Sequence, residues 1–193
     1  MYQVIGTMKT RAALVVWALE EMGLPYELQV EQPQSDRVRA LNPSGKVPVL
    51  LEGDEILTDS TAILTYLADK HAMLTFPAGT LDRARQDGLI HTLLDEFDAL
   101  LWTAARHSFI LPPDLRVPAI KDSLRWEFAR NAARLAPRIK GPYLMGETFT
   151  IADIVAEHCL SWARAIRFAH EVPALDSYLA HVQTRPAFQR VKA

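Results

Sequence analysis

The chain has 193 residues, 49% of them hydrophobic and 23% charged, which is enough to bury a core in one large domain or two small ones. Its 21 basic and 23 acidic residues give a net charge of −2, and this balance argues against a surface for nucleic acid or anionic membrane. The longest apolar stretch, residues 12–19, is shorter than the ~20 residues that span a bilayer, and no signal-peptide cleavage site follows it, so we expect a cytoplasmic protein.

Strand and helix patterns alternate over residues 1–76. Short alternating or β-prone runs predict strands, and apolar residues at helical spacing predict helices between them. The predicted strands are 2–5, 26–30, 47–51 and 55–57, and the predicted helices are 14–22, 35–41 and 59–71. This order predicts a mixed sheet of about four strands with helices on its faces.

Only helical patterns follow a linker with proline and glycine at 77–82. These patterns cover 83–107, 121–140, 150–169 and 174–184. We expect an unstructured tail after the last of them. The chain is therefore predicted to hold an α/β domain at 1–76, the linker, and an all-helical domain at 83–193.

Thr150 and Asp153 mark the start of one of these helices. Threonine is a favoured N-cap, and a carboxylate at the third helical position can reach back to the cap residue. We therefore interpret Asp153 as structural.

Cys159 is the single cysteine, and it lies at core spacing on the same helix. We expect it to be a buried thiol. One cysteine excludes an internal disulfide, a Cys-x-x-Cys redox pair and a zinc cluster of cysteines. We expect no metal site.

Pro48 stands inside the apolar run of a predicted strand. Proline donates no ladder hydrogen bond, so either this strand lies at an edge or the proline has another task. If the bond before Pro48 is cis, the N–H and C=O of Val47 turn out of the ladder and can pair with an extended peptide. A trans proline in an edge strand is the alternative.

Four stretches together resemble the glutathione transferases: RAALVVWALEEMGLPYEL, NPSGKVPVL, LTDSTAILTYLADK and TFTIADIV. The resemblance covers nearly the whole chain and implies an α/β thioredoxin-like domain followed by an all-α helical domain. It also implies that glutathione binds as a co-substrate, with no other cofactor, and that its ionised thiol attacks a small hydrophobic electrophile. A role in detoxification and a homodimer are usual in the family.

The resemblance places Lys46, Val47 and Pro48 against the tripeptide. Val47 offers backbone groups, and Lys46 is a candidate for the carboxylate or backbone of glutathione. A solvated lysine in a turn is the alternative for Lys46.

Asp59 and Ser60 open the helix predicted at 59–71. A carboxylate at a helix start can bind an ammonium, and the serine hydroxyl with free N–H groups can bind a carboxylate. The pair thus suits the γ-glutamyl end of glutathione, which carries both groups. Either residue can also be a simple N-cap, and the two roles are compatible.

Thr10 is the candidate activator of the thiol, with Thr7 as the alternative. Family members use a tyrosine, serine or cysteine in this region, and here the loop reads GTMKTRAAL. Lowering a thiol pKa from about 8.5 to about 6.5 takes ~2.7 kcal/mol. One charge-assisted hydrogen bond gives ~1.5–3 kcal/mol and a helix N-terminus ~0.3–1, so a threonine can suffice. An ordinary N-cap is the other interpretation of Thr10.

Trp102 and His107 end the first helix of the second domain, and the family's electrophile pocket lies there. Core packing is their alternative role. Isomerisation, dehalogenation or peroxide reduction with glutathione would fit the same residues. A binding or interaction protein without catalysis is a further alternative, because the loop lacks the family's usual tyrosine, serine or cysteine.

Overall fold

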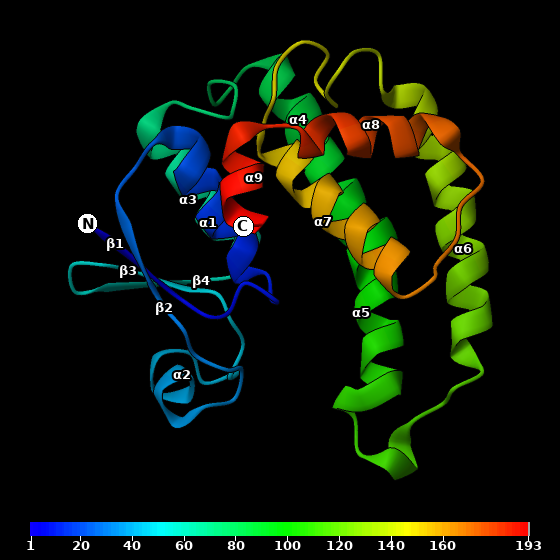
Figure 1. The fold of residues 1–193 in the computed structure, drawn as a ribbon, viewed down its shortest axis with the longest axis horizontal. Helices are drawn as coiled ribbons and strands as arrows, with labels where there is room; N and C mark the ends of the chain where they lie inside the picture. The colour runs from blue at the N-terminus through cyan, green and yellow to red at the C-terminus, as the bar shows by residue number, and fades with distance from the viewer. Residues whose placement is uncertain (193) are drawn as a thin grey trace. The chain divides into compact units, whose positions relative to one another are not determined.

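The computed structural model describes residues 1–192, which form two compact units (Figure 1). Residues 1–83 and 183–192 make the first unit, and residues 84–182 make the second. The last residues thus group with the first unit rather than with the helical domain, to which the sequence interpretation assigned all of 83–193.

A four-stranded mixed sheet forms the centre of the first unit. The strands are β1 (Tyr2–Ile5), β2 (Tyr26–Gln29), β3 (Val49–Glu52) and β4 (Glu55–Thr58). Their order is β2-β1-β3-β4, with β2 parallel to β1 and the other two pairs antiparallel. The predicted strands and hairpin are therefore present.

Helices cover both faces of this sheet (Figure 1). They are α1 (Ala12–Met22), α2 (Asp36–Leu41), α3 (Ser60–His71) and α9 (Pro186–Lys192). On one face Val38 of α2 packs with Ile5 and Val49 in a buried cluster. On the other, α1 packs against α3 and α9. This arrangement is the predicted α/β domain.

The tail expected after residue 184 is helical, so that expectation was wrong. Arg185 makes two hydrogen bonds of 2.7 Å to the carboxylate of Glu21 on α1. The Phe188 ring meets the Trp17 ring edge-on, with centroids 4.9 Å apart. A helix as short as α9 is unstable alone, so this packing on α1 is what stabilises it.

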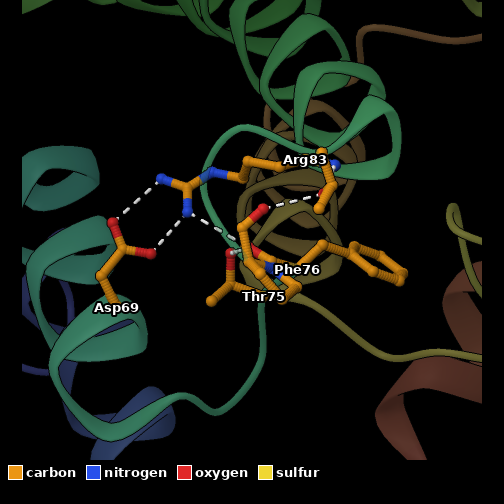
Figure 2. Close-up of polar contacts among 6 residues, drawn as sticks. Asp69, Thr75, Phe76 and Arg83 are labelled. Atoms are coloured by element: carbon orange, nitrogen blue, oxygen red, sulfur yellow. Dashed lines mark hydrogen bonds and ion pairs between the residues drawn. The ribbon is translucent and has the colours of Figure 1, made fainter.

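The linker is fixed by Arg83, at the start of α4 (Leu81–Leu93). Figure 2 shows its guanidinium reaching Asp69 on α3 and the backbone oxygen of Phe76. The distances are 3.0 Å from Nη2 to Asp69 Oδ2 and 3.3 Å from Nη1 to the Phe76 oxygen. Thr80 Oγ1 in turn accepts from the Arg83 N–H. The end of the linker is therefore tied to α3.

Helices make up the second unit, as predicted. They are α4, α5 (Ala99–Ala105), α6 (Ile120–Leu135), α7 (Ile151–Ala165) and α8 (Pro173–Gln183). Two wider π-helical turns, Leu94–Asp98 and Arg106–Ile110, extend α4 and α5 in the region where one regular helix was predicted. Buried side chains such as Phe97 and Phe128, whose ring centroids lie 5.3 Å apart, form the core.

Asp153 has the structural role that the sequence predicted. Its carboxylate is fully buried and accepts hydrogen bonds of 2.8 Å from the N–H groups of Leu144 and Thr150 and from the Tyr178 hydroxyl. Burial raises the pKa of the Asp153 carboxyl, while the two backbone bonds act in the opposite direction. The expected burial of Cys159 is also confirmed. Asp153 thus joins the start of α7 to α8.

The helices of residues 1–192 include none that is both long and apolar enough to cross a membrane.

Candidate functional site

The strand register brings three of the predicted segments to one end of the sheet. Ile5 at the end of β1 pairs with Val49 at the start of β3, and Val49 pairs with Thr58 at the end of β4. The residues just after β1, just before β3 and just after β4 therefore lie along one edge. These are the threonine-containing loop, the segment that ends in Pro48, and Asp59 with Ser60.

Gly6 allows this edge to be compact. Its φ of +147° is rare for residues with a side chain. A Cβ on Gly6 would lie 2.7 Å from the Ala12 Cβ and 3.2 Å from the Val47 Cβ. Because Gly6 has no side chain, both the start of α1 and Val47 can pack closely against the end of β1. The sequence analysis did not identify Gly6.

Val47 keeps its backbone groups unused at this edge. The Val47–Pro48 peptide bond is cis, and β3 begins only at Val49. Over residues 1–192, neither the N–H nor the C=O of Val47 makes a hydrogen bond. Both groups are therefore available to an extended ligand backbone.

The turn before Val47 is built by Asn42, which the sequence analysis did not identify. Its Nδ2 donates to the Lys46 carbonyl at 2.9 Å, and its Oδ1 accepts from the Ser44 N–H at 3.2 Å. Gly45 has φ +68°, and its carbonyl accepts from the Gln34 N–H at 2.8 Å. This side-chain-to-backbone turn fixes the Lys46 backbone and leaves its side chain exposed. The spacing of Asn42 and Ser44, an asparagine two residues before a serine, is the sequence signal that could have predicted this turn.

Asp59 is the N-cap of α3 and has an unusual backbone. Its Oδ1 accepts from the N–H groups of Thr61 and Ala62 at 2.9 and 3.0 Å. In the described part of the chain its Oδ2 accepts no hydrogen bond. Its φ of 70° and ψ of 121° lie outside the regions that residues with a side chain prefer, at a cost of ~1–3 kcal/mol. Such strain is concentrated at functional sites, and the cap leaves one oxygen for a ligand.

Ser60 follows as the first residue of α3. It is buried, and its hydroxyl has no hydrogen-bond partner among the described residues. The N–H groups of a helix's first turn lack intrahelical partners, so Ser60 can offer both an O–H and an N–H.

Thr10 lies in the turn ahead of α1, and its hydroxyl is engaged. Oγ1 donates to the Thr7 carbonyl at 2.7 Å and accepts from the Ala12 N–H at 3.3 Å. These are the bonds of a turn and helix start, the alternative interpretation of Thr10. The buried Thr7 hydroxyl, by contrast, has no partner within residues 1–192.

Trp102 and His107 lie in the second unit. Trp102 is half-buried on α5, and His107 belongs to the π-helical turn that follows. His107 Nδ1 accepts from the Val117 N–H at 3.1 Å and so holds the loop before α6. The described residues contain no group of three or more His, Cys, Asp or Glu that could hold a metal ion.

Comparison with known proteins gives matches along most of the chain. The family model "Glutathione S-transferase, N-terminal domain" matches residues 12–70, and "Glutathione S-transferase, C-terminal domain" matches 98–186. Glutathione S-transferase 1 of Schizosaccharomyces pombe is 30% identical, covering 93% of this chain and 85% of its own.

Solved structures have a similar fold. A glutathione transferase from Methylococcus capsulatus is 25% identical, with a TM-score of 0.85 over 99% of this chain and 97% of its own. A glutathione transferase family member from Pseudomonas fluorescens, solved with two glutathione bound, is 23% identical. Its TM-score is 0.84, and the match covers 98% of this chain and 91% of its own.

Proposed function

Because this chain belongs to the glutathione S-transferase family, we propose that it binds glutathione along the sheet edge at Val47 and transfers it to a small electrophile. The observation that carries the proposal is the unpaired backbone of Val47, next along the edge to Asp59 and Ser60. An extended tripeptide needs a backbone partner in its middle and charged partners at its ends. This edge offers both.

In this proposal the cysteinyl unit of glutathione pairs with the N–H and C=O of Val47, held in place by Pro48. The γ-glutamyl ammonium binds Asp59 Oδ2, the oxygen that the cap does not use. The γ-glutamyl carboxylate accepts from the Ser60 hydroxyl and N–H. Lys46 lies next to Val47 and supplies a positive charge to the glycyl carboxylate.

The thiol would lie near the start of α1, where Thr10 is our first candidate to stabilise the thiolate. The N-terminus of α1 favours negative charge and adds ~0.3–1 kcal/mol. To donate to sulfur, the Thr10 hydroxyl must turn away from the Thr7 carbonyl, which accepts its hydrogen in this structure. Thr7 has an unengaged hydroxyl and is the second candidate.

The ionised sulfur attacks the electrophile, forms the carbon–sulfur bond and displaces a leaving group or adds to a double bond. We propose that Trp102 and His107 line the pocket for the electrophile. We further propose a cytoplasmic homodimer that acts in detoxification and uses no cofactor besides its co-substrate.

A second candidate function is glutathione binding without catalysis. The engaged Thr10 hydroxyl favours it, because a hydroxyl that donates its one hydrogen to the Thr7 carbonyl cannot at the same time donate to sulfur. The two functions share the binding edge and differ only in the state of the bound thiol.

Calorimetry with millimolar glutathione tests the binding edge. Asp59→Asn keeps a good N-cap but removes the charge, so we expect affinity to fall about tenfold, equivalent to ~1.4 kcal/mol. Asp54→Asn is the matched control, because Asp54 lies in the turn at the opposite end of β3 and β4. Absence of binding heat in the unmodified protein, or equal losses in both variants, would contradict the proposal.

Ultraviolet difference spectra at neutral pH separate the two functions. A transferase should show the thiolate absorbance band when glutathione binds, and a binding protein should show binding heat without that band.

A further inference from the structure

A cavity of about 190 Å³ lies in the second unit, between the π-helical turn after α4 and the end of α6. Its polar lining residues are Thr92, Glu96, Asn131, Arg134 and Arg138. Pockets for drug-sized ligands measure roughly 300–1,000 Å³, and one water takes about 30 Å³ of liquid. The size of this cavity suits a ligand of only a few non-hydrogen atoms.

Asn131 presents a buried hydrogen-bond acceptor here. Its side chain is 3% exposed, and its Nδ2 donates to the Glu96 carbonyl at 2.9 Å. Exchanging the amide nitrogen and oxygen would bring two oxygens together, so the Glu96 carbonyl fixes the orientation. The Asn131 Oδ1 then has no donor among residues 1–192. Buried acceptors are nearly always paired, so this one calls for a donor, which a water or a small ligand in the cavity can supply.

Glu96 adds a negative charge to the same cavity. It belongs to the π-helical turn Leu94–Asp98, and such turns are frequent at functional sites. Its half-buried carboxylate has no cationic partner in the part of the chain that the structure describes. Together with the Asn131 Oδ1, it offers two acceptors to a positively charged group.

Two arginines add positive charge. The Arg134 guanidinium has no carboxylate partner within the described residues, and that of Arg138 reaches only Thr92 Oγ1, at 3.5 Å. Arg125 and Arg130, on α6 with Arg134, each form an ion pair instead. Arg134 and Arg138 can therefore bind a carboxylate without breaking an ion pair.

We propose that this cavity binds a small zwitterion, namely a free α-amino acid. Its ammonium donates to Asn131 Oδ1 and the Glu96 carboxylate, and its carboxylate accepts from Arg134 and Arg138. A simple anion would be repelled by the Glu96 carboxylate and the Asn131 Oδ1. A simple cation would be repelled by the two guanidiniums. Only a ligand with both charges satisfies both halves of the site. The site lies on different residues from the proposed glutathione edge and does not depend on that proposal.

The test follows the Asn131 side-chain amide by ¹⁵N NMR in the full chain, without glutathione. Glycine is the probe, and acetate and methylamine are matched probes that each lack one charge. We expect a saturable shift with glycine and at least tenfold weaker binding of the other two. No saturable shift with millimolar glycine overturns the proposal, and so does binding of acetate or methylamine as tight as that of glycine.

Four charge-neutralising variants complete the test. Glu96→Gln and Arg134→Gln should each weaken glycine binding at least tenfold. Glu127→Gln and Arg125→Gln, on the same helix as Arg134 but outside the cavity, should leave it unchanged. If the control variants weaken binding as much as the cavity variants, the shift reports general charge and the site is refuted.

Discussion

The Thr10 hydroxyl donates to the backbone carbonyl of Thr7 across 2.7 Å. A threonine that activates a thiol must give up this bond, whereas one that only supports the turn keeps it. Substitution at residue 10 therefore distinguishes catalysis from structure.

We expect Thr10→Ala to raise the pKa of the bound glutathione thiol by about one unit or more and to lower conjugation at neutral pH about tenfold. The reason is the lost hydrogen bond to the thiolate. Spectroscopic titration of bound glutathione measures the pKa. Thr10→Ser should restore it, and Thr7→Val should leave it unchanged. If Thr10→Ala lowers only the melting temperature, Thr10 is a turn residue, and if Thr7→Val alone raises the pKa, the activator is Thr7.

Gly6→Ala should destabilise the first unit. The new methyl would lie 2.7 Å from the Ala12 Cβ, on a backbone with φ +147°. We expect a loss of ~2–3 kcal/mol in the free energy of unfolding, measured by urea denaturation. Gly88→Ala is the control, because nothing lies within 4 Å of the added Cβ. Within a helix that change should stabilise by up to ~1 kcal/mol. If the two substitutions change the free energy of unfolding equally, the close approach of Ala12 to Gly6 is ruled out.

Phe188→Ala should loosen α9 from α1. Phe188 is buried against Trp17, and removal of a buried aromatic ring costs ~3–5 kcal/mol. Phe109→Ala is the matched control, since that ring is 66% exposed and should matter by less than ~0.5 kcal/mol. Chemical denaturation compares the two variants. A cost below ~1 kcal/mol for Phe188→Ala would show that α9 is not docked in solution.

Glu20 should make a small contribution to stability that disappears in acid. The hydrogen bond from Arg190 of α9 lowers the pKa of the Glu20 carboxyl, against the opposing effect of burial. Because the folded pKa lies below the unfolded value of 4.5, the contribution is present above pH 4.5 and is lost as pH falls through the folded pKa. Glu20→Gln should therefore cost up to ~1 kcal/mol at neutral pH and nothing in strong acid. Denaturation curves at several pH values test this, and a constant difference at all pH values would contradict it.

Features encoded over a few neighbouring residues could be predicted from the sequence. The four strands, the hairpin, the Thr150–Asp153 helix start and the cap at Asp59 each follow from a short local pattern. The features that were missed depend on residues far apart. The α9 helix needs Trp17 and Glu21 of α1, and the role of Gly6 depends on the approach of Val47. The sequence left the role of Thr10 open between thiol activator and N-cap, because only the conformation of the loop decides which partner its hydroxyl meets.

The docking of α9 also has a consequence for the order in which the chain folds. The first unit is completed by residues 183–192, which are synthesised only after all of the second unit. The side of α1 that carries Trp17 and Glu21 therefore stays uncovered while residues 84–182 are made, which takes several seconds at roughly 5–20 residues per second. During that interval a chaperone can recognise this side of α1, and docking of α9 then covers it.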